Sequence, residues 1–271
     1  MGVYDPITAR LAEQAGARAA YVSGFAAAAV AAGYPDLGLM TQTEMAEHVR
    51  RICSATTLPV IADADTGYGG ILNVQRTVEL WQRAGASGLH IEDQVSPKRC
   101  GHIAGKAVIP SSEMVQKVRA AVDARLDSDF FIIARTDALA VTGLQDAISR
   151  CKSYAAAGAD ALFVDAPESE DQLRTIAQEL QGTGKSLLFN SARTGKSPSL
   201  SEQQLRDLGY DIVIYPIEAM LAAHAAAKRV MHSILKSGRT DTIAGQVTTF
   251  QEFNDFIELS AYISRESQYA T

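Results

Sequence analysis

Cysteine is scarce in this sequence, and so are positive charge and long apolar runs. Only three cysteines occur in 271 residues, Cys53, Cys100 and Cys151, and their odd number and wide spacing argue against a disulfide framework. Free thiols suit a reducing compartment, so we expect a cytoplasmic protein. Lys and Arg number 25 against 31 Asp and Glu. This acidic balance argues against nucleic acid or an anionic membrane as a partner, because both bind clustered positive charge.

Membrane spans and targeting segments are not expected either. The longest apolar stretch, residues 19–33, is interrupted by Ser23 and Gly24 and falls short of the roughly 20 residues that a span needs. The first residues lack the basic region of a secretory signal. Hydrophobic residues nevertheless make up 47% of the chain, enough for a sizeable core.

A repeated pattern organises the chain. In four places a helical stretch stops at a glycine and a short apolar run follows, as at residues 84–91. Glycine supplies the left-handed cap that ends a helix, and continuous apolar runs are typical of strands buried on both faces. Further strand-like runs lie at 58–62, 130–134 and 187–189, with 2–4 as the end of an eighth strand, and helical stretches include 73–83, 111–124, 144–157 and 201–208.

Strands that alternate with helices predict an α/β fold with parallel pairing. Eight such units in about 250 residues form a TIM-type (β/α)₈ barrel, and a doubly wound open sheet is the alternative. No linker divides the chain, so we interpret residues 1–271 as a single domain. Apolar residues at helical spacing predict C-terminal helices over 248–271 that cover the barrel or a neighbouring subunit.

Polar residues follow most of the predicted strands. The carboxyl ends of parallel barrel strands open on one face, where active sites are built. One such residue is usually a helix cap or a loop residue, but a polar residue at six successive strand ends favours an active site. The residues are Ser23 with Gly24, Asp63 with Asp65, His90 with Glu92 and Asp93, Arg135 with Asp137, Asp165, and Asn190.

The acidic residues predict a metal site. Asp63, Asp65 and Glu92 are hard oxygen ligands without a Cys/His set, which favours Mg²⁺ over Zn²⁺. Asp63 and Asp65 share one face of an extended segment because one residue separates them. The alternative is that one of the two caps the helix after the glycine-rich turn at 67–70.

A basic loop surrounds one cysteine, in Lys98-Arg99-Cys100-Gly101-His102. Positive neighbours lower the pKa of a thiol and favour the thiolate, and Gly101 and Gly105 permit the movement of a lid. A solvated basic loop with an incidental thiol is the alternative. Cys53 and Cys151 lie within helical patterns and are predicted to be packing residues.

These motifs together resemble the isocitrate lyase / phosphoenolpyruvate mutase superfamily over nearly the whole chain. The resemblance implies a barrel whose last helix is swapped between subunits, usually in a homotetramer, and Mg²⁺ (or Mn²⁺) with a small di- or tricarboxylate substrate. It rests on the segments 21–24, 33–38, 63–69, 91–94, 97–102 and 134–138 and on Asn190.

The resemblance also implies a role for each matching residue. Ser23 and Gly24 would hold the oxo-acid carboxylate, Arg135 would pair with a substrate carboxylate, and Asn190 would bind the other end. Cys100 would be the general acid. Asp36, Asp63, Asp65 and Glu92 would hold Mg²⁺ directly or through water.

The sequence departs from the family pattern near the substrate. Asp165 stands where glutamate is usual, Ser191 replaces methionine, and Arg193 stands where glutamate is frequent, which affects the expected substrate. The chain also starts at the end of the first strand, which affects the expected barrel wall.

The residues suit a retro-aldol cleavage of a 2-hydroxydicarboxylate to a 2-oxo acid and a carboxylate-stabilised carbanion. Tyr21 is the candidate base, although it could equally pack inside the barrel. Arg135, Lys98 and His102 would stabilise the anion, and Cys100 would protonate it. Residues 101–106 favour the branch of dimethylmalate lyases and oxaloacetate hydrolases over methylisocitrate lyases. A phosphonate mutase, an oxaloacetate hydrolase and a non-catalytic dicarboxylate-binding barrel are the alternatives.

Overall fold

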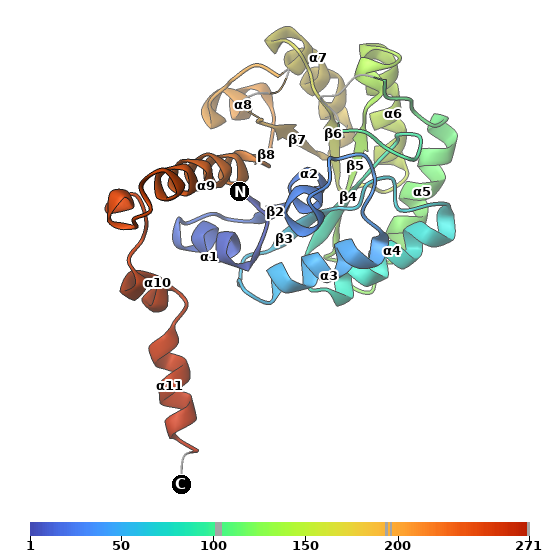
Figure 1. Ribbon diagram of the computed structural model, residues 1–271. Coiled ribbons are helices and arrows are strands. Elements are labelled where there is room, and N and C mark those ends of the chain that lie inside the picture. Colours follow the sequence, from blue (N-terminus) through green and yellow to red (C-terminus); the bar gives the residue numbers. More distant parts are fainter. Residues whose placement is uncertain (101–104, 193–194, 196, 270–271) are drawn as a thin grey trace. The chain divides into compact units, whose positions relative to one another are not determined.

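The apolar runs pair into one parallel sheet in a computed structural model, which describes residues 1–100, 105–192, 195 and 197–269. Its eight strands stand in chain order, and each pairs in parallel with the next (Figure 1). The strands are β1 (Gly2–Val3), β2 (Ala20–Val22), β3 (Val60–Asp63), β4 (Gly88–Glu92), β5 (Phe131–Thr136), β6 (Ala161–Val164), β7 (Ser186–Asn190) and β8 (Ile212–Ile214).

The first and last strands meet, so the sheet closes. The backbone N–H of Gly2 donates to the carbonyl oxygen of Tyr215 at 2.8 Å. A Cβ atom at Gly2 would lie 2.3 Å from that oxygen, so this approach requires glycine. The predicted (β/α)₈ barrel is confirmed, and the open-sheet alternative is wrong because the strand order never reverses.

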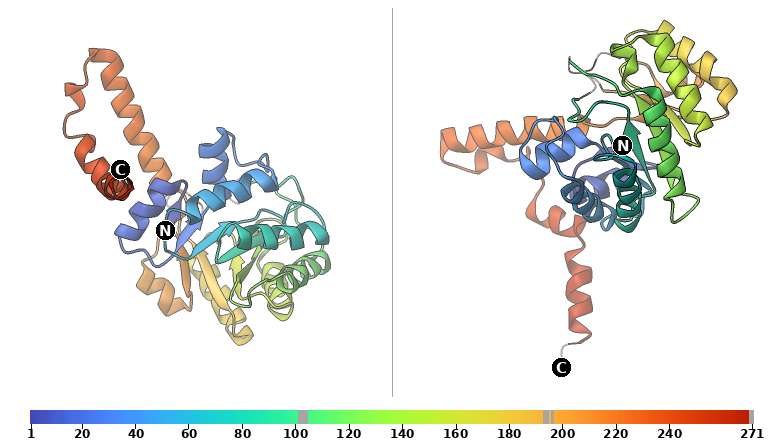
Figure 2. Two further views of the ribbon diagram at one scale, coloured as in Figure 1. Left: turned by 90° about the horizontal axis from the view of Figure 1, so that it is seen from below. Right: turned by 90° about the vertical axis from the view of Figure 1, so that its right-hand side faces the viewer.

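Helices cover the outside of the barrel (Figures 1 and 2). Several begin at side-chain caps, as where Thr41 and Glu44 form a capping box, or Ser201 and Gln204. Each amphipathic helix buries one face on the sheet, and Trp81 is among the largest fully buried side chains. The helices are α1 (Pro6–Gln14), α2 (Gly24–Ala27), α3 (Gln42–Cys53), α4 (Ile71–Arg83), α5 (Ser111–Asp123), α6 (Leu144–Ala156), α7 (Glu170–Leu180) and α8 (Glu202–Leu208).

Strand register brings the polar strand ends together. Asp63 at the end of β3 is aligned with His90 in β4, and Glu92 at the end of β4 is aligned with Arg135 in β5. Each predicted strand at 58–62, 130–134 and 187–189 has a counterpart that extends one or two residues further and ends on a polar residue. One rim of the barrel therefore carries the polar residues singled out in the sequence.

The chain divides into two compact units, Met1–Met220 and Leu221–Thr271. The prediction of one domain stays a prediction. The long helix α9 (Glu218–Ser237) is followed by α10 (Phe250–Phe256) and α11 (Leu259–Ser267), in agreement with the helices predicted over 248–271. Their exchange between subunits stays a prediction. Within the described residues, no helix is long and apolar enough to cross a membrane.

Candidate active site

A cavity of about 240 Å³ opens at the carboxyl ends of the strands. Strands β2, β3, β5 and β7 each place a polar residue on it, and loops supply the others. The structure thus brings most of the predicted site residues to one place. The lining residues are Tyr21, Ser23, Phe25, Asp36, Asp63, Lys98, Cys100, Arg135, Asp165, Asn190, Ala192, Gly195, Pro216 and Ile217.

Asp63 is held by backbone donors on both carboxylate oxygens. Oδ1 accepts from the N–H of Asp65 at 2.9 Å, and Oδ2 accepts from the N–H of Gly24 at 3.0 Å. A Cβ atom at Gly24 would lie 2.6 Å from Oδ2, so only glycine permits this contact. Gly24 therefore fixes Asp63, and its binding of a substrate carboxylate stays a prediction.

Ser23 and Asn190 both line the cavity, Ser23 directly after β2 and Asn190 at the end of β7. Ser23 precedes α2, and its side chain makes no capping hydrogen bond. The Oδ1 atom of Asn190 is buried and has no hydrogen-bond donor among the described residues. The Ser23 hydroxyl and the Asn190 amide N–H₂ are donors at the cavity and can bind a carboxylate there.

Lys98 joins two of the acidic residues. Its Nζ lies 2.6 Å from Asp36 Oδ1 and 3.0 Å from Asp65 Oδ1, and the lysine is buried. Burial alone would lower the pKa of Lys98, but Asp65, Asp63 and other carboxylates outweigh it and raise that pKa well above its usual value. Lys98 is therefore a charged ammonium group within an acidic cluster.

Tyr21 is paired with His90, which the sequence pattern placed at a strand end but to which no function was assigned. The Tyr21 hydroxyl lies 2.6 Å from His90 Nε2, and Nε2 lies 3.4 Å from Asp63 Oδ1. Burial raises the pKa of Tyr21 well above its usual value and lowers the pKa of His90. The phenol is therefore protonated and the imidazole is neutral, so Tyr21 can donate to His90. The sequence signal was the place of His90 near the end of a predicted strand, which does not reveal its pairing with Tyr21.

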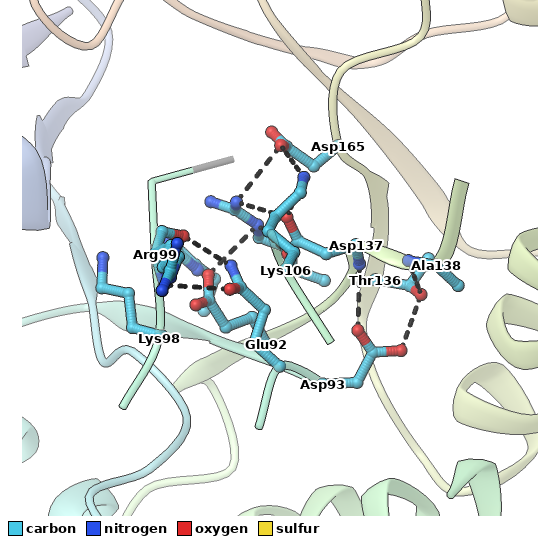
Figure 3. Close-up of polar contacts among 12 residues, drawn as sticks. Glu92, Asp93, Lys98, Arg99, Lys106, Thr136, Asp137, Ala138 and Asp165 are labelled. Carbon is cyan, nitrogen blue, oxygen red and sulfur yellow. Dashed lines mark hydrogen bonds and ion pairs between the residues drawn. The ribbon is translucent and has the colours of Figure 1, made fainter. Parts of the chain in front are cut away.

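Arg135 stands at the centre of a second charged cluster, because three carboxylates lie against its guanidinium. Figure 3 labels these three residues, Glu92, Asp137 and Asp165. Its guanidinium binds Asp137 through two contacts, Nε to Oδ2 at 2.9 Å and Nη2 to Oδ1 at 3.0 Å. Its other contacts are Nε to Glu92 Oε2 at 3.2 Å and Nη2 to Asp165 Oδ2 at 3.2 Å. Lys106 Nζ, 2.8 Å from Asp137 Oδ1, is a residue that the sequence analysis did not select. The pairing of Lys106 with this cluster has no local sequence signal, because Glu92, Arg135 and Lys106 come from β4, β5 and a loop that are separate in the chain.

Cys100 lines the cavity, and its backbone N–H donates to the carbonyl oxygen of Asp36 at 3.3 Å. The neighbouring backbone of Arg99 is fixed by Gln94, whose side chain accepts at 3.0 Å and donates at 2.8 Å. The thiolate character of Cys100 stays a prediction. Burial raises the pKa of the Cys53 thiol to about 11, and Cys151 is buried in the core, as expected of packing residues.

Three predicted residues, Gly101, His102 and Arg193, lie outside the described residues. The apolar lining residues were missed for another reason. Phe25, Ala192, Pro216 and Ile217 resemble core residues in type, and only the position of Pro216 directly after the last predicted strand marks it as part of the rim.

The acidic residues fit Mg²⁺ in their chemistry. Among the described residues, no group of three His, Cys, Asp or Glu side chains is arranged to hold a metal ion. Mg²⁺ keeps several waters, however, and needs only one or two carboxylates. Both carboxylate oxygens of Glu92 are buried and accept no hydrogen bond in the described part of the chain, although Arg135 Nε lies 3.2 Å from Oε2. Burial also raises the pKa of Asp65 to about 6. Buried acceptors of this kind are suited to a cation.

Comparison with known proteins places the chain in a family. The family model described as phosphoenolpyruvate phosphomutase matches residues 1–235. The chain is 39% identical over 270 residues to 2,3-dimethylmalate lyase of Eubacterium barkeri, covering 100% of this chain and 92% of the relative. It is 42% identical over 267 residues to 2-methylisocitrate lyase of Aeropyrum pernix, covering 98% and 85%. It is 41% identical over 273 residues to the chloroplastic carboxyvinyl-carboxyphosphonate phosphorylmutase of Arabidopsis thaliana, covering 99% and 80%.

Solved structures agree with this placement. Oxaloacetate acetylhydrolase bound to 3,3-difluorooxalacetate matches with a TM-score of 0.92 and 34% identity, covering 100% of this chain and 91% of that one. Phosphonopyruvate hydrolase bound to oxalate and Mg²⁺ matches with a TM-score of 0.89 and 31% identity, covering 99% and 93%. These relatives include lyases, hydrolases and a mutase. The chain is an enzyme-family member with a TIM-type barrel, and it belongs to the phosphoenolpyruvate mutase / isocitrate lyase superfamily.

Proposed function

We propose that the chain is a Mg²⁺-dependent carbon–carbon lyase that cleaves a 2-hydroxydicarboxylate to a 2-oxo acid and a carboxylic acid. The observation that supports this most is the position of Cys100. Cys100 lines the same cavity as Tyr21, Asp63 and Arg135. A thiol is a suitable acid for a carbanion, and a tyrosine paired with histidine can remove a hydroxyl proton from the same substrate.

Each step uses a residue of the cavity. Tyr21 takes the proton of the substrate 2-hydroxyl as its own phenolic proton passes to His90 Nε2, 2.6 Å away. The C2–C3 bond breaks, C2 becomes the carbonyl of the 2-oxo acid, and the electron pair remains on C3 as a carboxylate-stabilised carbanion. Arg135 balances the negative charge of this product, and the Cys100 thiol donates its proton to C3. Closure of the loop that carries Cys100 would exclude water.

Mg²⁺ fits the proposal through Asp63, Asp65, Asp36 and Glu92, which would hold it directly or through water. When bound, such a cation acts as a Lewis acid toward the substrate oxygens. The Mg²⁺ in the structure of phosphonopyruvate hydrolase supports the use of this metal in the superfamily. Ser23 and Asn190 would bind the ends of the substrate.

Incubation with a panel of acids tests the proposed reaction. The purified chain with Mg²⁺ should release a 2-oxo acid from at least one alkylmalate or methylisocitrate, and the 2-oxo acid is measured by reduction with a coupled dehydrogenase. Isocitrate and oxaloacetate complete the panel. Release of no 2-oxo acid from any member would contradict the lyase assignment.

Oxaloacetate hydrolysis is the second candidate, because the acetylhydrolase matches this chain with a TM-score of 0.92. In that reaction water attacks the keto carbon, so oxaloacetate would give oxalate and acetate. Formation of oxalate from oxaloacetate, without 2-oxo acid from the alkylmalates, would favour the hydrolase. A phosphonate mutase would act on neither group of substrates.

We expect 2,3-dimethylmalate, or another small alkylmalate, to have a higher kcat/KM than methylisocitrate. Residues 101–106 resemble the alkylmalate branch, and Asp165 adds a carboxylate to the cavity wall that a third substrate carboxylate would face. Arg193 has the opposite charge, and one Arg–carboxylate contact is worth roughly 1.5–3 kcal/mol, or one to two powers of ten. If kcat/KM for methylisocitrate exceeds that for every alkylmalate, Arg193 determines the preference. R193E should then lower kcat/KM for methylisocitrate more than for the alkylmalates.

We expect a homotetramer, or at least a dimer, in solution. Many apolar side chains of the C-terminal helices are exposed within their own unit, including Phe250 at 85% and Ile263 at 53%. Burial of such side chains against a second copy removes their apolar surface from water. Light scattering at micromolar concentration measures the mass, and a monomer would contradict this expectation.

A further inference from the structure

Asp93 lies behind the active site and does not line the cavity. It follows β4 directly, beside Glu92, and its side chain is fully buried. A buried carboxylate is costly unless donors surround it. Four donors do so, and they come from two elements, the end of β5 and helix α6.

The contacts from β5 fix the strand end. The Thr136 hydroxyl donates to Asp93 Oδ2 at 2.6 Å, and the backbone N–H of Asp137 donates to Asp93 Oδ1 at 2.9 Å (Figure 3). Helix α6 completes the set, with the Tyr154 hydroxyl at 2.8 Å and Arg150 Nη1 at 3.2 Å from Oδ2. Both oxygens of Asp93 therefore accept hydrogen bonds, one on Oδ1 and three on Oδ2.

Asp137 transmits this order to the cavity. The same residue whose N–H is held by Asp93 binds the Arg135 guanidinium through two contacts and binds Lys106 Nζ at 2.8 Å. Asp93 also accepts from Ile109 N–H through its backbone oxygen at 2.9 Å. The stretch from Lys106 to Ile109 is therefore also attached to Asp93.

We propose that Asp93 is a positioning residue that fixes Arg135 and Lys106, through Asp137, for a substrate carboxylate. This inference rests on the proposed function in one respect, that Arg135 binds a carboxylate of the substrate. Asp93 itself touches no substrate. Asp93 holds Asp137 in place, and Asp137 in turn sets the orientation of the Arg135 guanidinium. Without that constraint the guanidinium could reorient toward its other two acidic neighbours, Glu92 and Asp165.

The test compares two Asp→Asn variants of the full chain. D93N places an amide N–H₂ against either the Asp137 N–H or the three donors on Oδ2, so one side loses its acceptor. The control, D160N, makes the same change at the opposite end of β5, where Asp160 accepts from the Ile132 N–H at 2.8 Å and from Arg125. D93N should weaken oxalate binding in excess Mg²⁺ at least about tenfold, the scale for residues that orient a binding group. D160N should leave that affinity unchanged, although both variants lower Tm.

Equal oxalate affinity in folded D93N and D160N would overturn the proposal, because a merely structural role changes Tm alone. If D93N does not fold, T136V removes the shortest of the four contacts, and oxalate affinity equal to that of the parent would overturn it in the same way. The double variant D93N/D137N should bind oxalate no more weakly than D137N, since Asp93 acts through Asp137.

Failure of the proposed function has a different signature. If the parent chain binds no oxalate, the assignment of the carboxylate site is wrong. The NMR resonance of the Arg135 Nε–H, identified by its loss in R135K, then tests the positioning role of Asp93 without any ligand. The resonance should shift in D93N and keep its position in D160N. An unchanged resonance in D93N would overturn the positioning role.

Discussion

Replacing Cys100 with serine should lower lyase turnover at least about 100-fold while leaving the fold intact, because a positioned general acid contributes on that scale. Serine changes only the side-chain sulfur to oxygen, so the backbone hydrogen bond from the Cys100 N–H to Asp36 should be retained. A hydroxyl is a far weaker acid than a thiol, and protonation of the carbanion would therefore fail. Turnover with saturating substrate measures the effect, and oxalate affinity should change little.

The cysteine on α3 provides the control for this experiment. C53S makes the same atomic change at a half-buried position away from the cavity, where burial raises the pKa of the thiol to about 11. C53S should keep the turnover of the parent. A folded C100S protein that turns over as fast as C53S would remove Cys100 from the mechanism.

Removal of the metal should abolish activity, and a variant without the Asp63 carboxylate should not regain activity when the metal is added back. EDTA should stop turnover, and added Mg²⁺ or Mn²⁺ should restore it in the parent chain. D63A should not recover at ordinary metal concentrations, because Mg²⁺ depends on few direct carboxylate ligands and one of the principal ones is gone. D63A also releases the Gly24 and Asp65 N–H groups that Asp63 accepts, so circular dichroism must show that the variant is folded.

D160N is again the matched control, since it alters a carboxylate that accepts a backbone N–H at the far end of β5. It should respond to EDTA and to added metal as the parent does. Full activity of the parent chain in excess chelator would contradict the metal assignment. Recovery of D63A at the same Mg²⁺ concentration as the parent would remove Asp63 from the ligand set while leaving the metal requirement in place.

Much of the architecture could be predicted because it depends on short-range chemistry. Apolar runs followed by polar residues predict buried strands with functional ends, and glycines mark the helix ends. The strands predicted at 58–62 and 130–134 end one and two residues before β3 and β5 do, because Asp63 and Thr136 are polar yet continue the ladder. The sequence pattern left the open sheet as an alternative, which the hydrogen bond between Gly2 and Tyr215 excludes because it joins the first strand to the end of the last.

The sequence by itself determined the parallel barrel, the rim on which polar residues gather, and most residues of the cavity. Periodicity and cap chemistry act over a few residues, so they can be read in one dimension. Only the tertiary structure decided the partners of each charge. Lys98 meets Asp36 across 62 positions and Tyr21 meets His90 across 69. The four donors around Asp93 likewise come from β5 and α6. Such pairings depend on which chain segments converge after closure and on the cost of leaving a buried charge unpaired, and neither can be read from local spacing.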